Sequence, residues 1–171
     1  LSLWQEQYNR RQTVLPLPDL VICGVGTRMY QPRDGGARWE EHTEWAAHVG
    51  QEWCHATVSA EVTALRQREG KCHLRLSADS RENEHLKLTF LVSEVAHGRV
   101  LAELGASLKQ VGVRFRTVTG LYHEPGWCYV DVLPARAGKA AAAAYAARLL
   151  GAAPEHVVVA GDAPNDMDAL A

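Results

Sequence analysis

The chain has 171 residues, 47% of them hydrophobic and 22% charged, which is typical of a globular protein large enough to bury a sizeable core. Its net charge of -2 provides no basic surface, so neither nucleic acid nor a membrane is expected as a partner. No apolar run reaches the length of a transmembrane helix, and the four cysteines form no CxxC pair, so a reducing, cytoplasmic location is expected.

The first part of the chain predicts a helix, a buried strand and a long helix. Residues 1–12 carry apolar side chains on one helical face. The continuous apolar run over 19–25 is typical of a strand covered on both faces of a parallel sheet. A turn over 32–36 is a candidate boundary between two lobes, and the spacing of apolar residues over 39–70 predicts helix.

The middle of the chain predicts a small α+β lobe. Alternating apolar and polar residues indicate strands over 86–92, 111–118 and 127–133. A helical pattern over 94–110 lies between the first two strands. This order predicts a sheet that helices cover on one face and that stays open on the other.

The last part predicts a helix and a second buried strand. Residues 136–150 include five consecutive alanines, the strongest helix former, and the apolar run over 156–160 resembles a buried parallel strand. Pieces of a core therefore lie at both ends of the chain, with the α+β lobe between them. The predicted division is 1–33 for the first part of the core, 34–126 for the lobe and 127–171 for the rest of the core.

Two carboxylates and an amide follow the second apolar strand. Asp162, Asn165 and Asp166 stand at its predicted carboxyl end, where open α/β sheets bind ligands. Carboxylate oxygens suit Mg²⁺, and Lys139 at the start of the preceding helix can neutralise a phosphoryl group. Taken alone, Asp162 could be a helix N-cap and Lys139 a solvated lysine. A lysine in the first turn opposes the helix dipole, however, and the combination favours a phosphoryl-transfer site.

Several blocks resemble haloacid dehalogenase (HAD) phosphatases, and in particular their sucrose-phosphate phosphatase branch. These blocks follow one another in the same order as in that family. They are Val25-Gly26-Thr27, Trp39, Trp45, residues 130–140 and residues 161–166. The resemblance implies an α/β fold with a HAD-like Rossmannoid core and an inserted α+β cap lobe that recognises the sugar. It also implies hydrolysis of sucrose 6-phosphate through an aspartyl-phosphate, with Mg²⁺ as cofactor.

The resemblance also assigns roles to individual residues. It implies that Lys139 stabilises charge, that Asp162 and Asp166 hold the metal, and that Asn165 orients the phosphate or the loop. Thr27 and Asp131 are weaker candidates for substrate contacts. The implied partners are a sugar-phosphate substrate and sucrose-phosphate synthase.

The sequence departs from the family pattern at its most reactive position. No Asp-x-Asp precedes residue 160, so the nucleophile of the family is absent, and Asp166-Met167-Asp168 falls at a helix start. The core is therefore expected to be incomplete and to lack N-terminal strands. One hypothesis is a fragment of an active enzyme, since both ends look cut. The other is a degenerate domain that binds a sugar phosphate or a synthase without turnover. Mannosyl-phosphoglycerate and trehalose phosphate remain alternative substrates.

Overall fold

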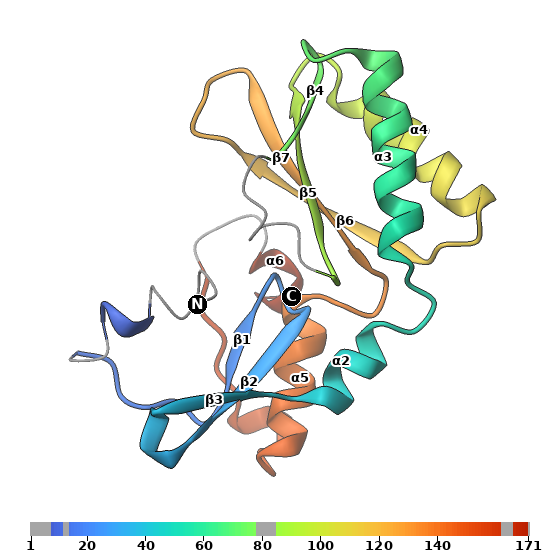
Figure 1. The fold of residues 1–171 in the computed structure, drawn as a ribbon. Coiled ribbons are helices and arrows are strands. Elements are labelled where there is room, and N and C mark those ends of the chain that lie inside the picture. Colours follow the sequence, from blue (N-terminus) through green and yellow to red (C-terminus); the bar gives the residue numbers. More distant parts are fainter. Residues whose placement is uncertain (1–7, 12–13, 78–84, 162–165, 171) are drawn as a thin grey trace.

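The computed structural model describes residues 8–11, 14–77, 85–161 and 166–170. Two antiparallel sheets lie in two lobes, one above the other in Figure 1, and each sheet packs against its own helices. The mixed α/β architecture expected from the sequence is confirmed. No helix in these described segments is long and apolar enough to cross a membrane.

The lower lobe is a three-stranded sheet with two helices. Its strands are β1 (Val21–Cys23), β2 (Arg28–Arg33) and β3 (Arg38–Glu41), in that spatial order. Helices α2 (Thr43–Val49) and α5 (Lys139–Leu149) complete the lobe (Figure 1). The buried side chains of its core are Met29, Trp45, Val49, Leu86, Leu133, Ala137, Ala142 and Ala146. Residues from both halves of the chain therefore share one core.

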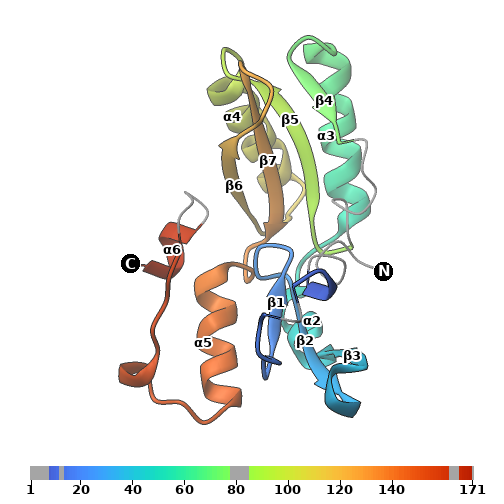
Figure 2. The same ribbon diagram turned by 90° about the vertical axis from the view of Figure 1, so that its left-hand side faces the viewer.

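The upper lobe is a four-stranded sheet covered on one face by two helices, which stand beside the sheet in Figure 1 and behind it in Figure 2. In spatial order its strands are β4 (Leu74–Leu76), β5 (Leu88–Ser93), β7 (Trp127–Pro134) and β6 (Phe115–Leu121). The covering helices are α3 (His55–Glu69) and α4 (His97–Gln110). Alternate residues of the central strands point towards these helices and form the larger core, which includes Leu88, Phe90, Val92, Val130 and Val132. The residues between them face the other way.

Short elements connect and end these lobes. A 3₁₀ turn, η1 (Asp34–Gly36), joins β2 to β3, and a second, η2 (Pro154–His156), follows α5. The last described element is α6 (Met167–Leu170), which lies beside α5. In Figure 1, α6 stands close to where the two lobes meet.

The helix and three strands predicted for the middle region are present, although the second strand begins at Phe115 and not at 111, whereas both predicted parallel strands are wrong. β1 has only three residues and pairs antiparallel with β2, because left-handed backbone at Gly24, Val25 and Gly26 turns the chain after Cys23. Over 157–161 no regular structure forms, and Val158 is 94% exposed. Among the described residues no strand lies beside this segment, so its backbone has no ladder to join.

The helix predicted over 39–70 is also wrong in its extent. Trp39 lies in β3, and two separate helices follow. Glu52, between α2 and α3, has a φ of 63°, which a helix cannot contain. Of the helix predicted over 1–12, residues 1–7 and 12 lie outside the described residues.

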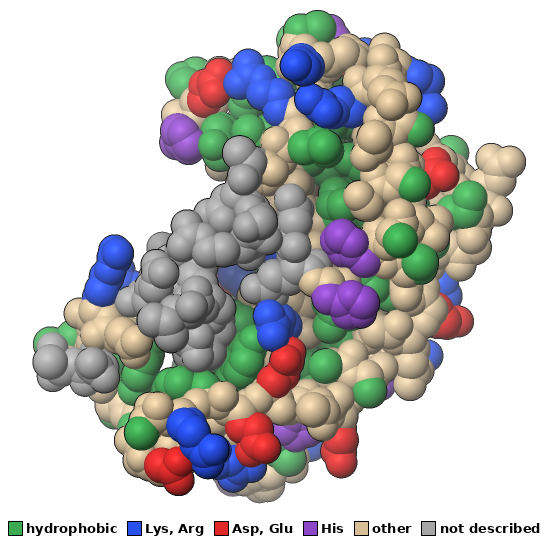
Figure 3. Space-filling view, viewed as in Figure 1, with side chains coloured by type: hydrophobic (Ala, Val, Ile, Leu, Met, Phe, Trp, Pro, Cys, Tyr) green, Lys and Arg blue, Asp and Glu red, His purple; other side chains and the backbone are tan. Residues whose placement is uncertain are grey.

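Charged side chains of both signs gather over the end of the β2–β3 hairpin (Figure 3). There the Arg33 guanidinium lies 2.6 Å from Glu40, and the Arg38 guanidinium lies 2.8 Å from Asp34. Such solvent-exposed pairs contribute little to stability. This end of the hairpin is a solvated, charge-balanced surface.

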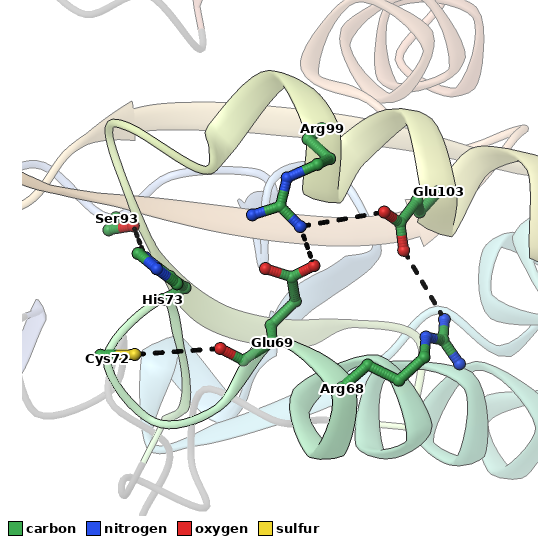
Figure 4. A network of polar contacts seen from close by, with 7 residues as sticks. All are labelled: Arg68, Glu69, Cys72, His73, Ser93, Arg99 and Glu103. Atoms are coloured by element: carbon green, nitrogen blue, oxygen red, sulfur yellow. Dashed lines mark hydrogen bonds and ion pairs between the residues drawn. The ribbon is translucent and has the colours of Figure 1, made fainter.

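A polar network joins the end of α3 to the start of α4 (Figure 4). The side chain of Glu69 is only 5% exposed and pairs with the Arg99 guanidinium. Arg99 and Arg68 each lie 3.9 Å from the Glu103 carboxylate. Glu69 is thus the shielded side chain of these ion pairs, and Arg68, Arg99 and Glu103 are exposed.

Replacing Arg99 with alanine is expected to lower the free energy of unfolding by about 1–3 kcal/mol, because it leaves the buried Glu69 carboxylate without its cation. Arg68→Ala, at the exposed edge of the same network, is the matched control and should cost less than about 0.5 kcal/mol. Urea denaturation of both variants measures the difference. Equal losses would show that the buried carboxylate does not depend on Arg99.

Candidate functional site

Lys139 and Asp166 come together where the two lobes meet. Lys139 is the first residue of α5, and its Nζ donates a hydrogen bond to Asp166 Oδ1 across 27 residues of sequence. The two side chains are 32% and 14% exposed. The ammonium is thus held by a carboxylate in the first turn of a helix, where backbone N–H groups point outward.

A strained turn in the lower lobe supports the start of α5. Gly24, Val25 and Gly26 have φ values of 59°, 60° and 84°. The left-handed region is unfavourable for a β-branched residue such as Val25 and is retained only where the surroundings enforce it. A side chain at position 26 would place its Cβ 2.3 Å from the backbone oxygen of Gly138. Glycine at 26 therefore lets the turn approach the residue that precedes Lys139.

Buried hydrogen bonds fix the same turn. Thr27 is fully buried, and its hydroxyl donates to the Gly24 carbonyl at 2.9 Å. The Trp45 indole N–H donates to the Gly26 carbonyl at 3.2 Å. Thr27 therefore holds the turn, and its predicted role as a substrate contact stays a prediction.

The face of the upper sheet that points away from α3 and α4 carries a second polar cluster. Asp131 is 5% exposed and accepts a hydrogen bond of 2.5 Å from the Thr89 hydroxyl. The Lys87 ammonium lies 3.7 Å from the same carboxylate oxygen. β5 and β7 pair Thr89 with Asp131, so their side chains share this face. Asp131 is thus a charged group built into the sheet.

Tyr129 links this cluster to the lower site. Burial raises the pKa of its phenol, and the negative charges of Asp131 and Asp166 raise it further, because both disfavour the phenolate. The Tyr129 ring lies across Gly120 of the neighbouring strand β6, where a Cβ would come within 2.4 Å of the phenol oxygen. Tyr129 is therefore influenced by both carboxylates, Asp131 on its own sheet and Asp166 beside Lys139.

A third contact ties the lobes together. Arg116 of β6 pairs with Asp168 of α6 at 3.0 Å and donates to the Ala137 carbonyl at 2.9 Å. Sequence reasoning did not identify Arg116, Lys87 or Thr89 as site residues. The alternation of β5 and β7 could have placed Thr89 and Asp131 on one face, whereas no local signal pairs Arg116 with a residue 52 positions away.

The metal prediction is only partly open to test in the described part of the chain. Asp162 and Asn165 lie outside the described residues. Within those residues no group of three or more His, Cys, Asp or Glu side chains could hold a metal ion. Asp166 provides one carboxylate beside Lys139. Mg²⁺ is often held by one or two carboxylates together with water and phosphate oxygens, so Asp166 fits as one ligand of such a site.

Comparison with known proteins places these features in a family. A family model described as Sucrose-6F-phosphate phosphohydrolase matches residues 3–171. A HAD-like hydrolase from Nitrosococcus oceani is 26% identical over 167 residues, which cover 94% of this chain and 42% of that protein. Sucrose-phosphatase 1 from Nicotiana tabacum is 25% identical over 162 residues, covering 93% of this chain and 34% of that protein. The chain therefore spans less than half the length of these relatives.

A solved structure shares the fold. It is the sucrose-phosphatase from Synechocystis sp. PCC6803 in complex with sucrose and phosphate. The match has a TM-score of 0.75 at 23% sequence identity and covers 99% of this chain and 62% of that one. The predicted HAD-like fold is thereby confirmed.

Proposed function

Because the chain belongs to the sucrose-6F-phosphate phosphohydrolase family, we propose that it binds a sugar phosphate as part of a sucrose 6-phosphate phosphatase. The observation that carries this proposal is the pairing of Lys139 with Asp166 at the first turn of α5. It provides a fixed cation beside outward-pointing N–H groups, which is the arrangement that attracts phosphate. Tyr129 of the upper sheet feels the charge of Asp166, which raises the pKa of its phenol.

The predicted site residues then have proposed roles in binding the phosphate group of the ligand. Lys139 neutralises charge on the phosphoryl group, and Asp166 keeps the ammonium in place. Asp162 and Asp166 are proposed to hold Mg²⁺, and Asn165 to orient the phosphate. When bound, Mg²⁺ would act as a Lewis acid on the phosphate oxygens.

At the sugar end, the proposed contacts lie on the polar face of the upper sheet. Asp131 could accept hydrogen bonds from sugar hydroxyls, and Lys87 and Thr89 hold its carboxylate in position. We also propose that the upper lobe is the sugar-recognising cap. The division at 33/34 and 126/127 remains a prediction, but strand pairing favours later boundaries, because β3 belongs to the lower sheet and β7 to the upper one.

A non-catalytic sugar-phosphate sensor or synthase-associated domain is the second candidate. One observation favours it: the two carboxylates of the Asp166-Met167-Asp168 pattern are paired with Lys139 and Arg116. Both carboxylates thus have a role in holding the structure together, as a binding domain without turnover would use them. Mannosyl-phosphoglycerate and trehalose phosphate remain alternative ligands, and the cytoplasm remains the predicted location.

Replacing Lys139 with methionine is expected to weaken binding of sucrose 6-phosphate about 10- to 100-fold, the usual worth of a charge-assisted contact. Isothermal titration calorimetry of the 171-residue chain with Mg²⁺ present measures this change. Lys109→Met, at the exposed end of α4, is the matched control and should bind like the unchanged protein. Equal affinities for all three proteins, or no binding by any, would contradict the proposal.

The same titration distinguishes the ligands. Stronger binding of sucrose 6-phosphate than of trehalose 6-phosphate or inorganic phosphate would support sucrose recognition. Equal affinity for sucrose 6-phosphate and inorganic phosphate would show that the chain contacts only the phosphate. Asp131→Asn should then leave affinity unchanged, whereas it should weaken binding if the sheet contacts the sugar.

A further inference from the structure

One guanidinium holds both segments that carry the Lys139–Asp166 pair. Arg116 Nη1 donates to the Ala137 carbonyl at 2.9 Å, two residues before Lys139. Its Nη2 lies 3.0 Å from Asp168 Oδ2, two residues after Asp166. Arg116 itself is in β6 of the upper sheet. A single side chain of the upper lobe thus holds the segment that leads into Lys139 and the segment that follows Asp166.

The environment of Asp168 makes loss of the contact with Arg116 costly. Its Oδ1 atom is buried and has no hydrogen-bond partner among the described residues. The Arg116–Asp168 pair is itself only partly exposed, with side-chain exposures of 34% and 26%. Without the guanidinium, this partly shielded carboxylate would lose its cation while its buried Oδ1 stayed without a partner. Release of the segment into solvent is then the less costly outcome.

The backbone at Gly138 is shaped around the same group. A Cβ at this position would lie 2.2 Å from Arg116 Nη1 and 2.9 Å from Asp168 Oδ2. Gly138 also has a φ of 139°, which side chains rarely adopt. The residue immediately before Lys139 is therefore one that leaves room for the guanidinium and the carboxylate together.

We propose that Arg116 is a positioning residue that holds Asp166 against Lys139 by anchoring α6 and the start of α5 to the upper sheet. The guanidinium provides a planar fork whose two nitrogens bond the carbonyl and the carboxylate in a fixed geometry, which the point charge of a lysine does not provide. Arg116 thereby couples the position of the upper lobe to the geometry of the cationic site. This inference depends on the geometry and is independent of the proposed substrate.

Hydrogen exchange of the 171-residue chain tests the proposal without any ligand. In Arg116→Gln, the amides of residues 142–146, the first in α5 that have a helical acceptor, should exchange at least about tenfold faster, while those of β5 and α4 stay protected. The Lys139 ammonium signal, seen by ¹⁵N NMR when the ion pair is held, should broaden. Arg114→Gln is the matched control, because Arg114 is exposed and contacts Glu52 instead.

Two further variants keep the test decisive if Arg116→Gln unfolds the protein. Asp168→Asn removes the charge but keeps the shape, and should release α6 in the same way. Arg116→Lys should restore part of the protection, because it keeps one of the two contacts. Unchanged exchange and an unchanged Lys139 signal in Arg116→Gln and Asp168→Asn would overturn the proposal. A failure of sugar phosphate to bind would overturn the proposed function alone.

Discussion

The 171-residue chain is expected to release phosphate from sucrose 6-phosphate at no more than about one-millionth of the rate of a complete phosphatase, the loss seen when a hydrolase lacks its nucleophile. No Asp-x-Asp occurs before residue 160. The Asp-x-Asp pattern that the chain does contain, at Asp166 and Asp168, is engaged by Lys139 and Arg116. This pattern stands at the start of α6 and not directly after a described strand, so it does not replace the missing nucleophile.

A phosphate-release assay with Mg²⁺ and sucrose 6-phosphate checks this result, with a full-length sucrose-phosphatase as the positive control. The Asp166→Asn and Asp168→Asn variants should give the same background as the unchanged chain. Turnover that disappears in one of these variants would identify that aspartate as a nucleophile and would contradict the assignment of Asp166 to the lysine. Binding without release would favour the sensor.

Replacing Phe90 with alanine is expected to lower the free energy of unfolding by about 3–5 kcal/mol, the usual cost of removing a large buried aromatic ring. Phe90 lies in β5 at the centre of the larger core and is fully buried. The helices α3 and α4 cover this face of the sheet, so the cavity cannot fill without moving one of them. This single loss is a large part of the total stability of a typical domain.

Urea denaturation of Phe90→Ala measures this loss. Phe90→Leu keeps most of the volume and should cost less than about 1.5 kcal/mol. Leu121→Ala, at an apolar residue that is exposed at the end of β6, should change stability by less than about 0.5 kcal/mol. Similar losses for Phe90→Ala and Leu121→Ala would show that the upper core is not the main source of stability.

The sequence predicted best where a pattern was local and regular. The alternation of β5, β6 and β7 and the apolar face of α4 depend on neighbouring residues alone, and these elements are present. The sequence patterns did not predict the short or interrupted strands that the structure contains. β2 contains Pro32, which usually marks a turn, and β4 has only three residues.

Apolar runs were misread because composition does not specify a pairing partner. The segments 19–25 and 156–160 look alike in sequence, but one forms an edge strand of an antiparallel sheet and the other pairs with no described strand. At the site, motif spacing suggested that Lys139 and Asp166 belong together. The Arg116 contacts depend on how the two lobes meet, which no local pattern encodes.

The strand order of the upper sheet also bears on how the protein matures. β7 lies between β5 and β6, and Leu88 of β5 pairs with Val132, far along the chain. During synthesis, β5 leaves the ribosome before β7 has been translated, so the edge of β5 that pairs with β7 is unpaired. Such non-local pairing slows folding and leaves an apolar edge open to association in the meantime. Nascent chains that have not reached β7 are therefore the species most in need of a chaperone.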